Sequence, residues 1–447
     1  RDSQRGVAIG AKHLPLPVGW MQLYGFGSWQ SRQVYQYEIF DKNQCDDPRS
    51  TDDSCSAPAT LVLDPDQSPL APTTAHKFQT LPRAYEEFLG GGNMTWFYDR
   101  RTHVGLTGYG ATTQWNVRGA NLDFQEWSAT PFGGPWGAIG ADMAWGRRWS
   151  DLGIELARSF DSMRKVTPDQ GGGGFAGIVR HTTTIDNHEL EVTARYYDQA
   201  YANPYAGPIS EADEYNGNRA RDEAGGRLRY TGRFAKRVDL RGLADLWVQP
   251  SRNIPKFYGY VRADVDVNQW FRPGLWLQYR SSDLRPGQTA GCIDTSGELD
   301  PNNINEDGSQ SYRSGCLAET GQIRARLAFK PIRRLSLTAQ YQHEVIDDVS
   351  LSGRPRQDIS AYLIIRANPF RSFRINARFK YLFEDIADNT RFEQSLWNYV
   401  DVSYVFKKVF LLRLRYDNYN WLDQRDSTLG RIPRYEHRLR LELEARF

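Results

Sequence analysis

The sequence has no long apolar run, which excludes a membrane-spanning helix. Hydrophobic residues make up 40% of the 447 residues, mean hydropathy is −0.64, and no segment approaches the roughly 20 apolar residues that such a helix needs. The net charge is only +2, which argues against a nucleic-acid-binding protein that depends on bulk charge. We also find no amphipathic helix, so nothing in the chain is available to cover the apolar side of a soluble sheet.

Cysteine is scarce as well, and its positions indicate an oxidising compartment. The four cysteines form two local pairs, Cys45 with Cys55 and Cys292 with Cys316, in segments rich in Asp, Ser, Gly and Pro. Four cysteines allow three pairings, and the short loops favour the local disulfides. Neither pair has the spacing of zinc ligands. A signal peptide is also missing, so we expect that Arg1 is not the natural start and that residues precede it.

Aromatic residues are plentiful: 24 Tyr, 21 Phe and 13 Trp stand against 4 Met. Rings gather in this way at the two water interfaces of membrane proteins. The last segment, RLRLELEARF from Arg438 to Phe447, alternates apolar and charged residues to its end. Both a soluble sheet and a transmembrane β-barrel contain such strands.

The same period of two recurs along the whole chain and predicts about 19 strands, with 18 to 20 as the range. The segments are 6–13, 19–35, 84–98, 102–116, 135–146, 150–161, 173–183, 188–198, 225–234, 237–249, 256–266, 270–282, 319–330, 334–345, 354–367, 371–384, 392–406, 409–421 and 432–447. Short turns alternate with longer connections, of which the longest are 36–83, 199–224 and 283–318.

One face of nearly every predicted strand carries charge, and this favours lipid on the other face. A closed barrel needs no covering layer, because lipid covers its apolar side and closure satisfies its backbone groups. We therefore predict an all-β fold, a transmembrane antiparallel up-and-down β-barrel that forms one domain over residues 1–447. A soluble all-β assembly is the alternative. The long loops and the cysteine pairs would lie outside the cell. An odd strand count means either that the count is off by one or, as we favour, that an odd number of strands precedes Arg1.

The chain resembles bacterial outer-membrane β-barrel proteins as a class. The terminal Phe447, with Leu443 and Leu441 alternating before it, resembles the C-terminal signal for barrel insertion. The segment Tyr196–Gly242 resembles the barrel region of Bacteroidota-type outer-membrane proteins that carry a helix-hairpin-helix segment. No helix-hairpin-helix motif is found in this chain, so the resemblance implies a fold and a location in the Gram-negative outer membrane, and no reaction.

Arginines on the charged faces are the first candidate site. They are Arg227, Arg229, Arg233, Arg324, Arg326, Arg374, Arg378, Arg413, Arg415 and Arg440. In the functional reading they line a lumen and favour anionic solutes. In the structural reading they pair across strands with Glu344, Glu384, Asp401, Asp417, Glu442 and Glu444 and fill the wall. Trp247, Trp276 and Tyr362 fall on the same faces by alternation.

Other candidate sites are weaker. Asn303, Asn305 and Asp307 precede a glycine as in a calcium loop, but the acidic residue that ends such a loop is missing, so a solvated polar loop is the alternative. No other cofactor is expected. The run Gly171 to Gly174 lacks the Lys and Ser or Thr of a phosphate loop. The seven scattered histidines leave a barrel-wall hydrolase as a minor alternative.

The sequence therefore favours a porin-like passive channel for small polar or anionic solutes, and not an enzyme. The alternatives are a structural or assembly barrel and the hydrolase. Expected partners are outer-membrane lipid and lipopolysaccharide, the barrel-insertion machinery and other envelope proteins, with no nucleic acid.

Overall fold

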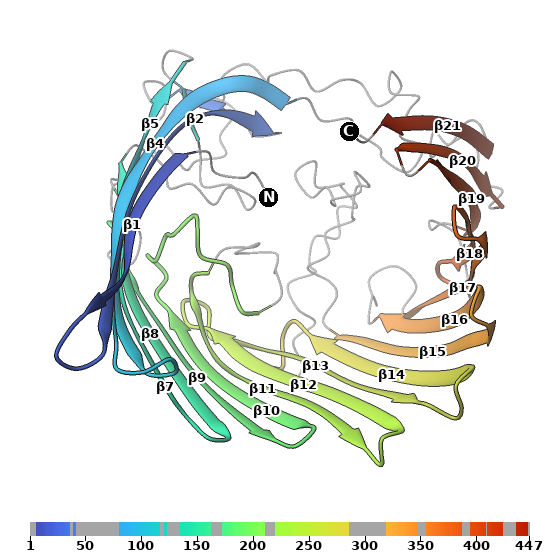
Figure 1. Cartoon of the computed structure of the whole chain (residues 1–447), viewed down its shortest axis with the longest axis horizontal. Helices are drawn as coiled ribbons and strands as arrows, with labels where there is room; N and C mark the ends of the chain where they lie inside the picture. Colours follow the sequence, from blue (N-terminus) through green and yellow to red (C-terminus); the bar gives the residue numbers. More distant parts are fainter. Residues whose placement is uncertain are drawn as a thin grey trace. The chain divides into compact units, whose positions relative to one another are not determined.

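The regular structure of the protein is β-structure (Figure 1). The computed structural model describes residues 6–35, 39–41, 80–116, 120–122, 135–161, 172–210, 220–285, 319–346, 355–386, 394–407, 409–422 and 435–445. Within these residues no helix is long and apolar enough to cross a membrane.

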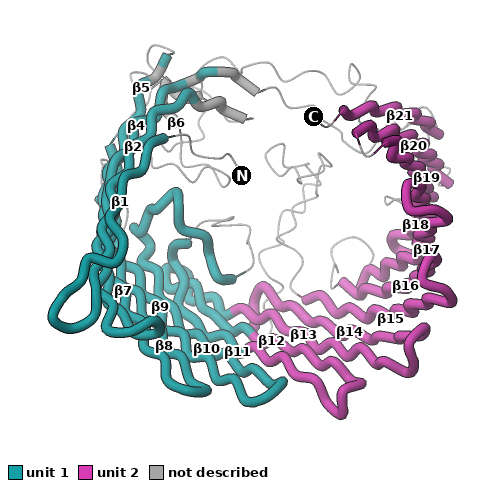
Figure 2. The backbone as a smooth tube through the Cα atoms, in the orientation of Figure 1, with its two compact units in different colours: residues 1–228, 245–255, 304–310 teal, residues 229–244, 256–303, 311–447 magenta. Residues whose placement is uncertain are grey.

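Two compact units divide the chain (Figure 2), and each is described by itself. Unit 1 contains β1 (Gly6–Pro15), β2 (Trp20–Tyr35), β3 (Ile39–Asp41), β4 (Thr80–Phe97), β5 (His103–Trp115), β6 (Ala120–Leu122), β7 (Trp136–Arg147), β8 (Ser150–Asp161), β9 (Phe175–Ile185) and β10 (His188–Tyr197). Strands β11 (Glu223–Phe234) and β12 (Val238–Gln249) contribute residues to both units.

Unit 2 contains β13 (Ile254–Val265, from Lys256 on), β14 (Phe271–Ser281), β15 (Glu319–Ile332), β16 (Leu335–Ile346), β17 (Arg356–Phe370), β18 (Phe373–Phe383), β19 (Gln394–Phe406), β20 (Phe410–Trp421) and β21 (Tyr435–Ala445). Nineteen of the described strands belong to one sheet. Short strands β3 and β6, which the sequence pattern did not predict, pair separately in unit 1.

Within each unit the strands pair antiparallel with their successors along a continuous ladder. In unit 1 the ladder runs from β1 through β2, β4, β5, β7, β8 and β9 to β10. In unit 2 it runs from β13 to β21 without interruption. This antiparallel, up-and-down order and the nineteen strands confirm the fold class predicted from the period-2 pattern.

Every second connection between successive strands of the sheet is a short turn. Arg148 after β7, Asp186 after β9, and Ala235 with Lys236 after β11 have φ between 45° and 58°. This left-handed backbone is the one that tight hairpins of the primed types require. Pro331 and Pro369 fall where the ladders β15 to β16 and β17 to β18 shift register next to such turns. A proline is tolerated there because the irregular pair lacks a normal ladder hydrogen bond.

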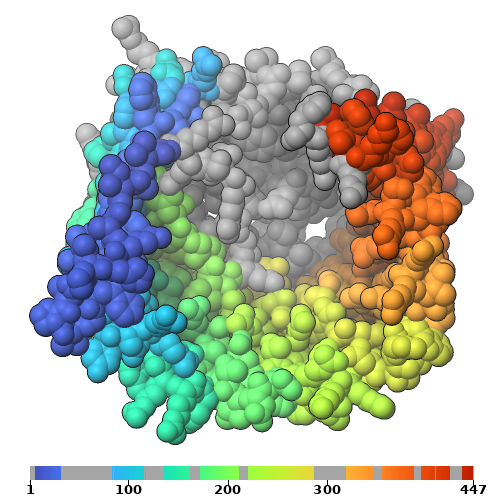
Figure 3. Space-filling model, viewed as in Figure 1, coloured from blue at the N-terminus to red at the C-terminus, as the bar shows by residue number. Residues whose placement is uncertain are grey.

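The apolar face of the strands is uncovered. Leu439, Leu441 and Leu443 on β21 are 71%, 69% and 72% exposed, and Val7 and Ile9 on β1, dark blue in Figure 3, are 70% and 76% exposed. Large apolar side chains are also exposed on strands of both units between these ends. Such a face needs lipid around it. With its up-and-down strands and alternating turns, the chain is an integral outer-membrane protein of the β-barrel class.

Many of the exposed rings lie toward the ends of the strands on this apolar face. Toward the short turns they include Trp96, Tyr98, Trp145 and Trp149 in unit 1 and Trp270, Phe370, Phe406 and Phe410 in unit 2. Toward the longer connections they include Trp29, Phe160, Phe175, Tyr196, Tyr279 and Tyr435. Aromatic rings at both ends of an apolar band are typical of the two membrane interfaces.

Candidate functional site

The ten arginines singled out in the sequence all lie on the face opposite the exposed apolar one, here called the polar face. They come from five strands: β11 (Arg227, Arg229, Arg233), β15 (Arg324, Arg326), β18 (Arg374, Arg378), β20 (Arg413, Arg415) and β21 (Arg440). Their sequence neighbours are exposed apolar side chains, for example Leu327 at 49% and Leu414 at 43%. The period of two, a property of the extended backbone, puts them on one side.

Some of these arginines are neutralised by carboxylates. Arg413 lies 2.6 Å from Asp401 and 3.5 Å from Glu442. Arg415 lies 2.7 Å from Asp417, and Arg227 lies 2.6 Å from Asp245. Arg229 also has a partner. The structural interpretation therefore holds for Arg413 and Arg227, whose partners lie on neighbouring strands, whereas Asp417 lies on the same strand as Arg415. Asp401, Asp417 and Glu442 are among the carboxylates that the sequence proposed.

Five of the ten have no ion pair within the described ranges: Arg324, Arg326, Arg374, Arg378 and Arg440. All five belong to unit 2. Glu344, proposed as a partner, instead accepts hydrogen bonds from Gln322 and Gln342 at 3.1 Å and 3.4 Å. Among the described residues, an excess of guanidinium charge therefore remains on the polar face of unit 2.

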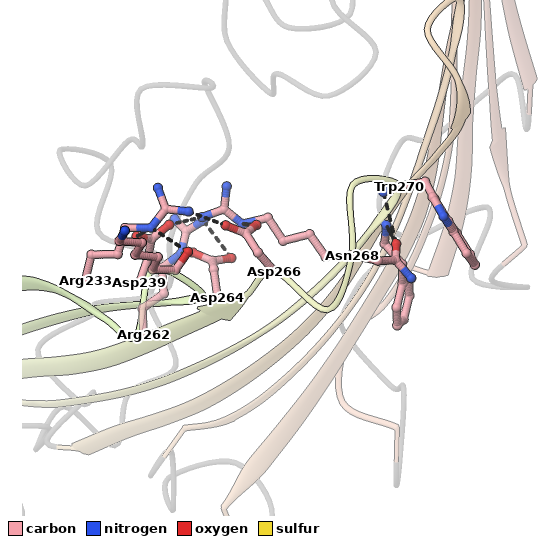
Figure 4. Close-up of polar contacts among 10 residues, drawn as sticks. Arg233, Asp239, Arg262, Asp264, Asp266, Asn268 and Trp270 are labelled. Atoms are coloured by element: carbon pink, nitrogen blue, oxygen red, sulfur yellow. Dashed lines mark hydrogen bonds and ion pairs between the residues drawn. The ribbon is translucent and has the colours of Figure 1, made fainter.

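A compensated cluster lies near the short turns of unit 2 (Figure 4). Arg233 contacts Asp266 at 2.6 Å and Asp239 at 3.6 Å, and Arg272 bonds to the same two carboxylates. Asn268 accepts bonds from the backbone N–H of Trp270 and Phe271 and so fixes the turn between β13 and β14. Two arginines and two aspartates balance, and the four side chains are 23–45% exposed, so this cluster adds little stability.

Arginines of unit 2 also stack on aromatic rings. Arg262 and Arg324 lie 5.5 Å and 4.4 Å from the Trp276 ring centroid. Arg378 and Arg415 lie 5.2 Å and 4.5 Å from that of Tyr399. Arg378 also lies 4.2 Å from the Trp397 ring. Cation–π contacts at these distances are attractive and restrict the guanidinium plane.

Unit 1 has a different polar face, because a segment of main chain folds onto it. Residues 198–210, between β10 and β11 (green in Figure 1), pack there; they overlap the loop that the sequence predicted over 199–224. Ser159 Oγ accepts bonds from the N–H of Ala202 at 3.0 Å and of Gly174 at 3.1 Å. Tyr109 donates its hydroxyl to Asn203 at 2.7 Å. We call residues 198–210 the folded-in segment.

A buried charged network fixes the end of the folded-in segment. Arg195 bonds to Glu223, and its Nη1 donates to Asp245 at 2.7 Å; Arg195 and Asp245 have no exposed side-chain surface. Arg227 donates to the other oxygen of Asp245 and to the carbonyl of Ile209. The Ser210 hydroxyl donates to Glu223. Two arginines and two carboxylates thus neutralise one another, and only Arg227 among them keeps appreciable exposure.

Between the folded-in segment and the wall lies a cavity of about 180 Å³. Small residues leave this space, among them Ala157, Ala176 and Gly177, and Glu155 supplies the one carboxylate of the lining. The rings of Tyr197 and Tyr201 stack at 6.2 Å and close one side. Burial raises the pKa of the Tyr201 hydroxyl, because its anion would lose hydration. Sequence reasoning missed this region, since the pattern of β8 and β9 does not show what covers them.

Among the aromatics predicted for the polar face, Trp247 is buried at 6% exposure, with Arg195 5.9 Å from its ring. Tyr362 is placed between Gln340 and Lys380 by the register. Trp276 is the ring between Arg262 and Arg324 described above. All three lie on the predicted face.

One histidine meets a potential nucleophile. Ser150 Oγ and His181 Nε2 are 2.8 Å apart on the apolar face, beside the short turn between β7 and β8. His103 faces Asp142 at 3.3 Å on the polar face. No carboxylate orients His181 within the described part of the chain, so the arrangement lacks the third member of a catalytic triad.

Several predicted residues lie outside the described residues: Cys45, Cys55, Cys292 and Cys316, the calcium candidates Asn303, Asn305 and Asp307, and Phe447. The disulfides, the calcium loop and the terminal aromatic stay predictions. Leu441 and Leu443 of the insertion signal are exposed on β21. In the ranges that the structure covers, no group of three potential metal ligands is found.

Comparisons with known proteins give similarity only among solved structures. No family model matches the chain, and no curated protein matches it. It is similar to the copper transporter OprC (12% identity over 93% of this chain and 66% of the other, TM-score 0.45). It is also similar to OccAB1 of Acinetobacter baumannii, at 12% identity over 83% of this chain and 91% of the other, with a TM-score of 0.42. The outer membrane channel DcaP of the same species is similar at 11% identity over 82% of this chain and 94% of the other, with a TM-score of 0.31. The chain spans less than two thirds of the length of OprC.

Proposed function

We propose that this protein is a porin-like passive channel of the outer membrane that passes small polar solutes and prefers anions. The observation that carries the proposal is a set of five arginines on the polar face of unit 2 that form no ion pair with any described residue: Arg324, Arg326, Arg374, Arg378 and Arg440. A wall with surplus positive charge raises the local concentration of anions and lowers that of cations. The exposed apolar face would contact lipid and, at one interface, lipopolysaccharide.

The folded-in segment is compatible with this function. It is held by its own hydrogen bonds and by a neutral buried network, so it would act as a fixed part of the wall of unit 1. Because the charges of the buried network cancel, the arginines of unit 2 are the groups that would act on a passing ion. The resemblance to the Bacteroidota-type barrels is part of the same proposal and supplies no solute.

Planar-bilayer recording tests the channel. Purified protein should give single-channel steps, and the reversal potential in a potassium chloride gradient should indicate that chloride is more permeant than potassium. Replacing Arg324, Arg326 and Arg378 together by Gln should lower the permeability ratio of chloride to potassium by roughly twofold to tenfold. The paired substitution Arg413→Gln with Asp401→Asn, which removes equal and opposite charges, should change it least.

Protein that inserts into the bilayer but gives no steps would contradict the channel and favour the assembly barrel. Steps with a preference for potassium would contradict only the anion preference.

A further inference from the structure

Unit 2 repeats one arrangement in two places: an aromatic ring between two guanidinium groups. In the first, Arg262, Trp276 and Arg324 stand directly opposite one another on β13, β14 and β15. In the second, Arg378 stands opposite Tyr399 on β18 and β19, and Arg415 reaches the same ring from β20. We call these the first and second stacks. Neighbouring strands bring the three side chains within reach of each other.

Each stack contains one neutralised arginine. Arg262 lies 2.7 Å from Asp264, two residues further along its own strand. Arg415 has the same relation to Asp417, also at 2.7 Å. The other arginine of each stack, Arg324 or Arg378, has no carboxylate partner in the described residues. Each stack therefore carries one net positive charge on a side chain whose position is fixed by a ring.

The orientation of the two uncompensated arginines restricts which atoms a solute meets. The Nε atoms of Arg324 and Arg378 are buried and have no hydrogen-bond partner in the described structure. The terminal Nη groups are then the donors that remain for a solute. Two N–H groups in one plane match the two oxygens of a carboxylate or a phosphoryl group. A stacked guanidinium also loses less conformational freedom on binding than a mobile one.

We propose that the Arg324 and Arg378 guanidinium groups, each stacked on an aromatic ring, are two separate binding stations for an oxyanion. The inference deepens the proposed function, on which it rests, by naming the chemical class of the solute and the groups that bind it. The register places Arg324 level with Leu382 on β18, four residues beyond Arg378. The stations are three strands, about 14 Å, apart across the sheet and about 13 Å apart along it. A small oxyanion therefore occupies one station at a time, and repeated weak binding permits passage.

The chain supplies a matched control for each station. Arg326 lies on β15 two residues from Arg324, and Arg374 lies on β18 four residues from Arg378. Neither is ion-paired or stacked on a ring within the described part of the chain. Their replacement by Gln removes the same charge from the same strand and leaves both stacks unchanged.

Phosphorus NMR of inorganic phosphate tests the stations, because the phosphate line broadens when phosphate binds the protein. The whole detergent-solubilised protein is used, at a constant ionic strength set by potassium chloride. Arg324→Gln and Arg378→Gln should each weaken phosphate binding by about tenfold at their own station, and the double variant should abolish the line broadening. Arg324→Lys and Arg378→Lys keep the charge and the fold but lose the planar fork, and should show most of the same loss. Arg326→Gln and Arg374→Gln should retain most of the broadening.

Acetate, followed by proton NMR, separates the two sources of the oxyanion. Broadening by both probes indicates a general oxyanion station, and broadening by one assigns it to carboxylate or phosphoryl. The inference is overturned if neither probe binds, or if the control arginines matter as much as Arg324 and Arg378, since charge alone would then explain binding. Oxyanion binding by a protein that gives no current would contradict the proposed channel and leave the stations in place.

Discussion

The two units share one backbone pattern but fill their polar faces in different ways. In unit 1, small polar-face residues such as Ala157 and Ala176 leave space, and the folded-in segment occupies it with main chain. In unit 2, long side chains such as Arg324, Trp276 and Arg378 occupy the corresponding layer themselves. Small polar-face residues on β8 and β9 thus leave room for a covering segment, whereas the long polar-face side chains of unit 2 fill that layer themselves.

The comparison extends to charge. Asp245 in unit 1 is completely buried between Arg195 and Arg227, whereas Asp417 in unit 2 retains 20% of its side-chain exposure beside Arg415. Burial makes each partner of the first network indispensable, because a lone charge without water is costly. The second pair remains hydrated and is worth little to stability.

The largest effect should follow from Asp245→Asn. It leaves Arg195 and Arg227 without a full counter-charge, and we expect a loss of about 3–5 kcal/mol in the free energy of unfolding. Urea unfolding in detergent micelles, followed by tryptophan fluorescence, measures it. Asp417→Asn is the matched change in unit 2 and should cost less than about 1 kcal/mol. Equal losses of unfolding free energy for the two variants would show that the buried ion pair of unit 1 contributes no more to stability than the hydrated pair of unit 2.

A smaller effect should follow from Ser159→Ala, which removes the hydroxyl that holds the folded-in segment. The N–H groups of Gly174 and Ala202 lose their acceptor in a buried position, at a cost of about 1–3 kcal/mol. Amide hydrogen exchange should accelerate at Ala202 and its neighbours. Ser150→Ala, on the same strand but on the apolar face, should leave that exchange unchanged. Unaltered exchange in Ser159→Ala would mean that other contacts hold the segment.

The smallest effect should be on the free energy of unfolding at alkaline pH. Burial raises the pKa of Tyr201 above its ordinary value of 10.0, so its neutral form stabilises the folded state. This contribution is complete below pH 10 and declines as the pH rises from there toward the raised pKa. The free energy of unfolding should fall more between pH 9 and pH 11 in the wild type than in Tyr201→Phe. Identical falls would exclude Tyr201 as the titrating group.

Much of the fold was predictable from the sequence, since alternation is visible residue by residue. The nineteen strands, the short turns after β7, β9 and β11, and the exposed leucines of β21 all follow from it. The ten arginines were assigned to one face for the same reason. Which of them are neutralised was not predictable: Arg413 and Arg324 each have a carboxylate diagonally across the ladder, Asp401 and Glu344, but only Arg413 forms the ion pair.

The stacks and the buried network depend on register, which no single strand encodes. Arg262, Trp276 and Arg324 are far apart in sequence and meet because three strands align them. The position of residues 198–210 likewise depends on small residues from β8 and β9, so its own composition gave no signal.

The sequence alone determined that this protein is built from amphipathic strands with one face for lipid, because a period of two fixes the side of every residue. Only the tertiary structure decided which charges cancel, which remain and where main chain covers the sheet. Those outcomes depend on distances between atoms of different strands, and such distances are set by pairing and packing rather than by local order.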